Sequence, residues 1–243
     1  MGADRAETGL AQRLTEVARS LQEQGSLERT LRVIVDTAPD FVEGAGHAGI
    51  TALRDNRTLD SPAYTDELVL HLDRVQSEVG EGPCMAAAGR NEVLHIDDMA
   101  TEGRWPRFAE RAAGLGVGSM IACGLRADGY PRKAALNLHA PRPGAFDRAT
   151  AHVASLYAEH ASLALGNAAA IESLRGAMGR RQTIGEATGI LMERHRVSSR
   201  EAFSMLAGAS QRLNIKVSAI SEHVVLSGQD PRTITAADLP AVR

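Results

Sequence analysis

Apolar residues recur at steps of three and four near the start of the chain. They are Leu10, Leu14, Val17 and Leu21, followed by Leu27, Leu31 and Val35. This spacing places them on one side of a helix, so residues 10–41 are expected to form amphipathic helices. Gly25 and Ser26 interrupt the pattern and separate two helices. Residues 1–9, which precede the pattern, are expected to form a flexible terminus.

Between residues 44 and 143 the pattern changes to short apolar runs separated by polar segments. The stretches HAGITAL and NEVLHIDD are expected to be strands, and DELVLHLDRVQSEVG and RWPRFAERAAGLGV to be helices. The stretch SMIACGLRADGYPRKAALNLHA predicts a β-hairpin, because two apolar runs flank a polar loop that contains Asp128 and Gly129. Strands and helices do not alternate regularly here, so we predict an α+β domain built on an antiparallel sheet flanked by helices.

From Phe146 onward the pattern is helical, and residues 147–180 contain no proline. An apolar stripe follows this segment through Val153, Leu156, His160, Leu163, Asn167, Ile171, Leu174 and Met178. Steps of three and four over several heptads are typical of a coiled-coil seam. Residues 147–180 are therefore expected to form a connecting helix through which two copies make a parallel homodimer. Gly176 and Gly179 are expected to loosen this helix and form a hinge before the last domain.

The last part of the chain shows three short helical patterns. The first covers about residues 181–195, the second begins at SSREAF, where Ser198 and Glu201 have the spacing of a capping box, and the third stops at Gly228. Their apolar positions fit three helices that share a small core. These positions are Ile184, Ala187, Leu191, Ala202, Leu206, Ala209, Leu213, Val217, Ile220 and Val224. Residues 230–243 are expected to be a C-terminal tail.

Gly185 and Gly189 lie inside the first of these three helices, although each glycine in a helix interior costs about 1 kcal/mol relative to alanine. At 100° per residue they fall away from the core side, next to Met192 and close to Arg181 and Gln182. Two interpretations remain open. Either a polynucleotide approaches the bare backbone, or small residues let a second helix pack closely against the strip.

Composition limits the classes of partner and of location. The chain has 44% apolar but only 3% aromatic residues, so its core must consist of Ala, Val, Leu and Ile. The net charge of −3 means that any surface for a polyanion must be local. No stretch resembles a signal peptide or reaches the roughly 18–20 apolar residues of a membrane span. Two cysteines do not make a disulfide scaffold. We therefore expect a reduced cytoplasmic protein with no membrane partner.

The stretch RQTIGEATGILMERHRVSSREAFSMLAGASQRLNIKVSAISEHVV closely resembles the ANTAR domain, a three-helix RNA-binding module of transcription antiterminators. The resemblance covers about residues 174–229 and rests on Arg181, Ile184, the ATGILM and EAF blocks, Leu206 and SQRLN. It implies that the domain binds paired RNA hairpins through their small loops and so prevents a terminator hairpin from forming. Loop bases are splayed out and can be read, whereas bases in helical RNA cannot.

The resemblance also implies an RNA-binding surface on this domain. We expect it to consist of Arg181, Gln182, Gly185, Thr188, Gly189, Met192, Arg194, Gln211 and Arg212. Two positions depart from the family pattern, because Thr188 stands where lysine is frequent and Ala207 where arginine is common. Residues 172–232 nevertheless hold nine basic side chains against six acidic ones, a balance of +3. Two such domains presented together in a dimer would raise the affinity for RNA.

Residues 10–167 resemble a GAF domain, a sensor module with an antiparallel sheet flanked by helices. The matching stretches run from EVGEGPC to SMIACGL and over AALNLHAPRPGAFD, with Ala135 where glycine is frequent. GAF domains bind cyclic nucleotides, haem, chromophores or no known ligand, so the resemblance implies an unidentified small-molecule ligand. Cys84, His95 and Cys123 are the ligand-binding candidates, and His47 and His139 are the other residues able to coordinate. Their spacing fits no metal motif, so neither a metal nor another cofactor is predicted.

We find no sequence signal for an enzyme. Asp97 and Asp98 are adjacent on a strand and so point to opposite faces, whereas acid–base catalysis needs both groups in one cleft. No nucleophile elbow, zinc-protease, phosphate-loop or dinucleotide-binding motif occurs in the sequence. The prediction is a signal-responsive RNA-binding antiterminator. The alternatives are a DNA-binding regulator and a sensor module that only dimerises.

Overall fold

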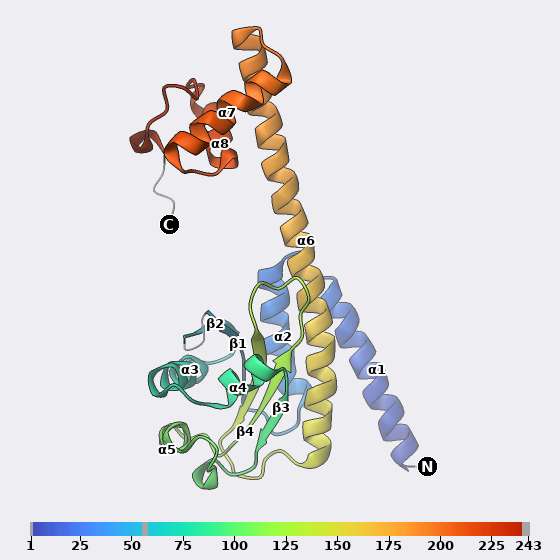
Figure 1. Ribbon diagram of the computed structural model, residues 1–243. Helices are drawn as coiled ribbons and strands as arrows, with labels where there is room; N and C mark the ends of the chain where they lie inside the picture. The colour runs from blue at the N-terminus through green and yellow to red at the C-terminus, as the bar shows by residue number, and fades with distance from the viewer. Residues whose placement is uncertain (1, 55–57, 240–243) are drawn as a thin grey trace. The chain divides into compact units, whose positions relative to one another are not determined.

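A computed structural model describes residues 2–54 and 58–239 of the chain (Figure 1). The chain divides into two compact units, Met1–Glu172 and Ser173–Arg243. One helix, α6 (Arg148–His195), belongs to both units and is continuous over 48 residues. Gly176 and Gly179 lie within this helix and do not interrupt it.

The first unit is built on a five-stranded antiparallel sheet, as the sequence predicts. Its strands are β1 (His47–Leu53), β2 (Leu59–Tyr64), β3 (Val93–Ile96), β4 (Ser119–Leu125) and β5 (Ala134–Ala140). They are arranged in the order β2-β1-β5-β4-β3, so β2 and β3 are the edge strands. The β4–β5 hairpin forms as expected, with Leu125 opposite Ala134. Strand β2 has no alternating pattern and contains Pro62, which an edge strand tolerates.

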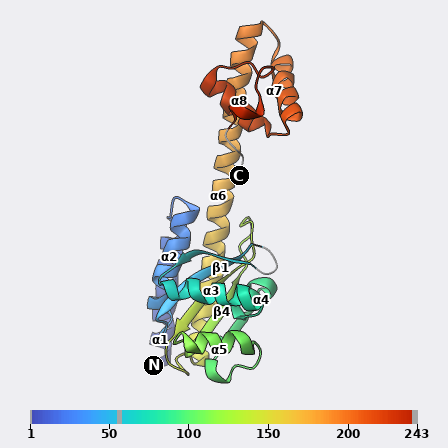
Figure 2. The same cartoon turned by 90° about the vertical axis from the view of Figure 1, so that its left-hand side faces the viewer.

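Helices cover both faces of the sheet (Figures 1 and 2). On one face, α1 (Gly2–Gln22), α2 (Leu27–Phe41) and the first half of α6 enclose an apolar core that includes Ile34, Ile50 and Tyr157. On the other face, α3 (Glu67–Val79), α4 (Pro83–Arg90), the 3₁₀ turn η1 (Met99–Thr101) and α5 (Pro106–Gly114) enclose a second core around Phe108 and Met120. Helix α1 begins at Gly2, inside the nine residues expected to be a flexible terminus.

The second unit contains the end of α6 together with α7 (Ser199–Leu213) and α8 (Val217–Ser227). Ser198 and Glu201 form the predicted capping box, and Gly228 ends α8 in the left-handed conformation. The core contains the predicted Ala187, Leu191, Ala202, Leu206, Ala209, Ile220 and Val224. Three helices around one small core confirm the predicted architecture.

Residues 230–239 are not a free tail. Ile234 is 2% exposed and Leu239 is 8% exposed, and both belong to the core of the second unit. The expectation of a tail from residue 230 is therefore wrong over the described part. Periodicity could not reveal this segment, because isolated apolar residues outside a helix show no repeat.

Candidate nucleic-acid interface

An open groove lies between the last turns of α6 and the first turn of α7, with a volume of about 720 Å³. Gly185 and Gly189 form part of its wall. A Cβ atom added at either glycine would meet no atom within 4 Å, so the chain itself does not require glycine there. The bare strip therefore faces open space rather than the unit's own core. The groove is lined by Arg181, Ile184, Gly185, Thr188, Gly189, Met192, Ser199, Arg200 and Phe203.

The side chains around the strip combine positive charge with exposed apolar surface. Arg181 lies on α6 and Arg200 on α7, and both are exposed. Met192 is 38% exposed and Phe203 is 46% exposed, although large apolar side chains usually lie inside a domain. Guanidinium groups bind phosphate, and an aromatic ring beside bare backbone offers a surface on which a base can stack. No Asp or Glu is among the described residues that line the groove.

Five of the nine residues expected on the RNA-binding surface line this groove. They are Arg181, Gly185, Thr188, Gly189 and Met192. Thr188 is largely buried, and its hydroxyl donates to the Ile184 carbonyl at 2.7 Å. Because its hydroxyl proton is used in this bond, Thr188 shapes the wall of the groove and offers no free donor to a ligand.

The other four predicted residues lie outside the groove. The Gln182 side chain donates to Glu186 at 2.9 Å, and Gln211 is exposed on α7. Arg194 lies beside the end of α8, because a Cβ atom added at Gly228 would be 3.7 Å from its Nη2. Arg212 donates to the carbonyls of Pro231 and Ile234 at 2.9 Å and 3.2 Å. Arg212 thus holds the C-terminal segment in this structure.

The sequence interpretation missed three groove residues, namely Ser199, Arg200 and Phe203. Phe203 carried a signal that could have identified it. It directly follows Ala202, which is buried, so Phe203 points away from the apolar side of α7. A large aromatic residue outside the apolar stripe of an amphipathic helix is a candidate contact residue.

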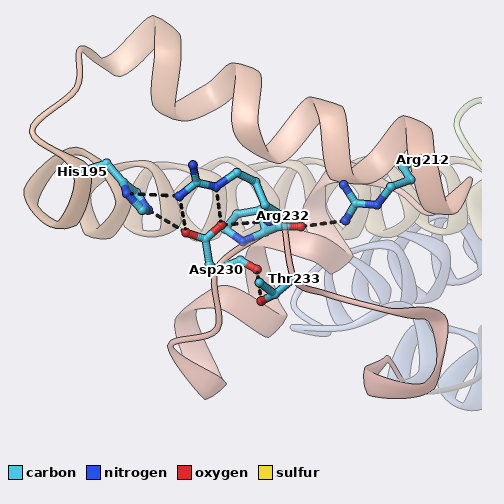
Figure 3. Close-up of polar contacts among 6 residues, drawn as sticks. His195, Arg212, Asp230, Arg232 and Thr233 are labelled. Atoms are coloured by element: carbon cyan, nitrogen blue, oxygen red, sulfur yellow. Dashed lines mark hydrogen bonds and ion pairs between the residues drawn. The ribbon is translucent and has the colours of Figure 1, made fainter.

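The segment after α8 is fastened to the three helices by polar contacts (Figure 3). Asp230 lies 2.8 Å from His195 Nε2, and it accepts two bonds of 2.9 Å from the Arg232 guanidinium. These hydrogen bonds from Arg232 hold the pKa of Asp230 well below its usual range. His195 is the last residue of α6, so this cluster ties the end of that helix to the C-terminal segment.

The three ligand candidates of the first unit do not come together. Cys84 is in α4 and belongs to the core on one face of the sheet, whereas Cys123 belongs to the core on the opposite face. His95 is on the edge strand β3, opposite Ile121. Burial raises the pKa of Cys123 to about 12, and burial followed by the charge of Asp73 raises the pKa of Cys84. Both cysteines are free thiols, and both stay protonated. Among the described residues no three His, Cys, Asp or Glu side chains gather as a metal site.

A buried polar network occupies the face of the sheet beneath α3 and α4. Asp73 accepts hydrogen bonds from Thr51 at 2.7 Å and from Ser61 at 2.6 Å, and Asn137 donates to Thr51 at 2.7 Å. The side-chain oxygen of Asn137 and both ring nitrogens of His139 are buried without a partner in the described residues. Burial lowers the pKa of His139 to about 4, so the ring is neutral. Unpaired buried polar atoms require an explanation such as a bound molecule.

Asp73→Asn is expected to change how stability depends on pH. Burial, the largest cause, raises the pKa of Asp73 from 3.8 to about 6. The folded state therefore binds the proton more tightly, which stabilises it below pH 3.8, and this contribution is lost as pH rises through 6. A shift of two pKa units corresponds to about 3 kcal/mol. Urea unfolding monitored by Trp105 fluorescence at pH 4 to 8 measures the effect.

The difference in unfolding free energy between Asp73→Asn and the wild type should move in favour of the variant as pH rises from 4 to 7. Asp128→Asn provides the control, because Asp128 is exposed on the β4–β5 loop. If the difference in unfolding free energy between the Asp73 variant and the wild type does not change with pH, ionisation of Asp73 has no cost in the folded state.

Comparisons with known proteins agree with this division of the chain. The GAF domain family matches residues 24–166, and the ANTAR domain family matches residues 172–225. A search of curated proteins finds no match. No helix in the described part of the chain is long and apolar enough to cross a membrane.

Two solved structures share the fold of the first unit. The GAF domain of a phosphoenolpyruvate-protein phosphotransferase from Coxiella burnetii is 14% identical, with a TM-score of 0.51, over 68% of this chain and 96% of that one. The chromophore-binding domain of a bacteriophytochrome from R. palustris is 13% identical, with a TM-score of 0.54, over 68% of this chain and 63% of that one. At these identities the likeness shows the fold alone. Because the GAF match covers more than half of its residues, the chain belongs to the GAF domain family, and it carries a C-terminal ANTAR domain.

Proposed function

We propose that the protein is a signal-responsive transcription antiterminator that binds hairpin loops of nascent RNA through the groove between α6 and α7. The observation that carries this proposal is the open strip at Gly185 and Gly189, where missing side chains serve no packing need within the unit. The ANTAR match over residues 172–225 supports RNA as the partner, since ANTAR is an RNA-binding antiterminator domain.

The groove suits an unpaired base better than a paired one. A base turned out of a loop can lie flat against the bare backbone at Gly189 and stack on Phe203. Arg181 and Arg200 can then contact the phosphates on either side of that base, which positions the loop without reading its sequence. The protein acts by this binding and not by catalysis.

We infer that control reaches the RNA-binding domain through a homodimer. Leu163 is 62% exposed, Leu174 is 65% exposed and Met178 is 72% exposed, and all three belong to the apolar stripe of α6. A second copy of this helix would bury that stripe as a coiled-coil seam. A signal that favours one packing of the seam over another shifts the population of RNA-binding molecules.

The signal is a small molecule held on the face of the sheet that carries the unpaired polar atoms. Asn137 and His139 offer it one acceptor and two ring nitrogens, and Asp73 lies in the same network. A polar ligand that donates to the Asn137 oxygen and to an unprotonated ring nitrogen of His139 would satisfy these groups.

Phe203→Ala is expected to weaken binding of a hairpin RNA by about five- to a hundred-fold, the range of 1–3 kcal/mol for one lost base stack. Leu226→Ala is the matched control, because Leu226 is an 80% exposed apolar residue on α8 that does not line the groove. Affinity is measured by fluorescence anisotropy with three nucleic acids. They are a hairpin RNA, an RNA of the same stem in which the loop bases are paired, and duplex DNA. Equal affinity for the three nucleic acids would overturn the proposal, and preference for duplex DNA would favour a DNA-binding regulator.

A further inference from the structure

A second positively charged surface lies on the first unit, at the end of the sheet where β1 and β4 end and β5 begins. Two adjoining hollows of about 380 and 430 Å³ share Gly89, Pro131, Arg132 and Lys133 as lining residues. Arg90 and Arg126 line the first hollow in addition, and Arg54 lines the second. We call these five cations (Arg54, Arg90, Arg126, Arg132 and Lys133) the hairpin patch, after the β4–β5 hairpin whose loop carries three of them.

The hairpin patch contrasts with the charge of the unit that carries it. Met1–Glu172 contains 17 basic and 24 acidic side chains, a net charge of −7. Even so, no Asp or Glu is among the described residues that line either hollow. Three of these cations pair with described carboxylates, because Asp60 pairs with Arg54 and Arg132, and Glu92 pairs with Arg90 at 3.3 Å. Glu159 lines a neighbouring hollow together with Arg126. Among the described residues, Arg126 and Lys133 form no ion pair with a carboxylate.

The backbone brings these cations together from segments that are far apart in the sequence. Arg54 follows β1, Arg126 follows β4, and Lys133 precedes β5. The Lys133 ammonium donates to the Gly89 carbonyl at 3.2 Å, which links the loop to the end of α4. Gathering like charges raises the energy of the folded state, so an anion that covers them would stabilise this arrangement.

We propose that the hairpin patch binds the phosphate backbone of the RNA whose loops the C-terminal domain reads. The cations follow two hollows side by side instead of converging on one point, which fits a chain of phosphates better than one small anion. Four of the five are arginines, and their planar guanidinium groups bind phosphate in a bidentate manner. The choice of RNA as the polyanion rests on the proposed function. The patch itself reads no sequence, because phosphate contacts carry none.

The test uses the full chain with Arg126 and Lys133 both changed to Ala, and an RNA with two hairpins on long stems. Each phosphate contact contributes about 0.9 to the slope of log affinity against log salt, so the double variant should lower that slope by about two. The ratio of affinities for the correct and a scrambled loop should not change. The control is a variant with Arg74 and Arg148 changed to Ala, which removes two exposed cations elsewhere on the unit.

The outcomes separate the two proposals. An unchanged salt slope in the double variant, or an equal fall in the control, would overturn RNA binding by the hairpin patch while leaving the groove untouched. The double variant could lower the salt slope while the wild type binds the correct and the scrambled loop equally well. This result would support RNA binding by the patch and overturn the loop-reading function. Binding of inorganic triphosphate that the double variant alone abolishes, with an unchanged RNA slope, would assign the patch to a small anion and overturn the RNA proposal.

Discussion

Gly189→Leu is expected to reduce the affinity for a hairpin RNA by about 100-fold, a loss near 3 kcal/mol. The leucine side chain would fill the strip that an unpaired base must occupy. It would do so without internal strain, because a Cβ atom at this position meets no atom of the protein within 4 Å. Replacing a helical glycine also removes a cost of about 0.8 kcal/mol, so the variant should be more stable than the wild type. Anisotropy titration and thermal unfolding measure the two effects.

Gly208→Leu separates the binding effect from the helix effect. Gly208 is also an exposed helical glycine with open space at its Cβ position, but it lies on α7 outside the groove. The same gain in stability is expected, with unchanged RNA affinity. If Gly189→Leu keeps full RNA affinity but disrupts a dimer in analytical ultracentrifugation, the strip serves close packing of two helices instead.

The sequence predicts the elements whose pattern is local and periodic. Ala187 and Leu191 on α6, and Ala202 and Leu206 on α7, recur at helical spacing, so the helical part of the C-terminal core follows from the sequence alone. Strand β2 and helix α4 have no such pattern. Pro62 interrupts β2, and the alanines of α4 follow a glycine and a proline that are typical of a loop. Both elements form because tertiary contacts outweigh weak local preference.

The candidate site is predictable only in part, because one wall follows from helical geometry and the other from tertiary packing. Helical geometry places Gly185 and Gly189 away from the core, and the structure confirms that they are exposed. The second wall of the groove comes from α7, and only tertiary packing shows that Arg200 and Phe203 face these glycines. Conversely, the family resemblance places Arg212 on the RNA-binding surface. It bonds two carbonyls of a segment whose fold no periodicity reveals.

Removing residues 230–243 is expected to unfold the C-terminal domain while leaving the first unit folded. The deletion takes Ile234 and Leu239 out of a small core, and burial of each such side chain contributes about 1.5–3 kcal/mol. It also removes the acceptors of Arg212 and the carboxylate of Asp230 beside His195. A domain of this size has only about 3–5 kcal/mol of core stabilisation in total. Hydrogen exchange resolved by segment measures the loss of amide protection in α7 and α8.

Ile234→Ala tests the same contact without a deletion. A large-to-small change at a buried isoleucine costs about 2–5 kcal/mol, so protection in α7 should fall by at least thirty-fold. Leu226→Ala is the control, since its 80% exposed side chain contributes little burial. RNA affinity should fall only as far as the folded fraction of the domain falls, because the groove exists only while α7 packs on α6. Full protection of α7 in the Ile234 variant would mean that three helices alone hold the groove and that the C-terminal segment is dispensable.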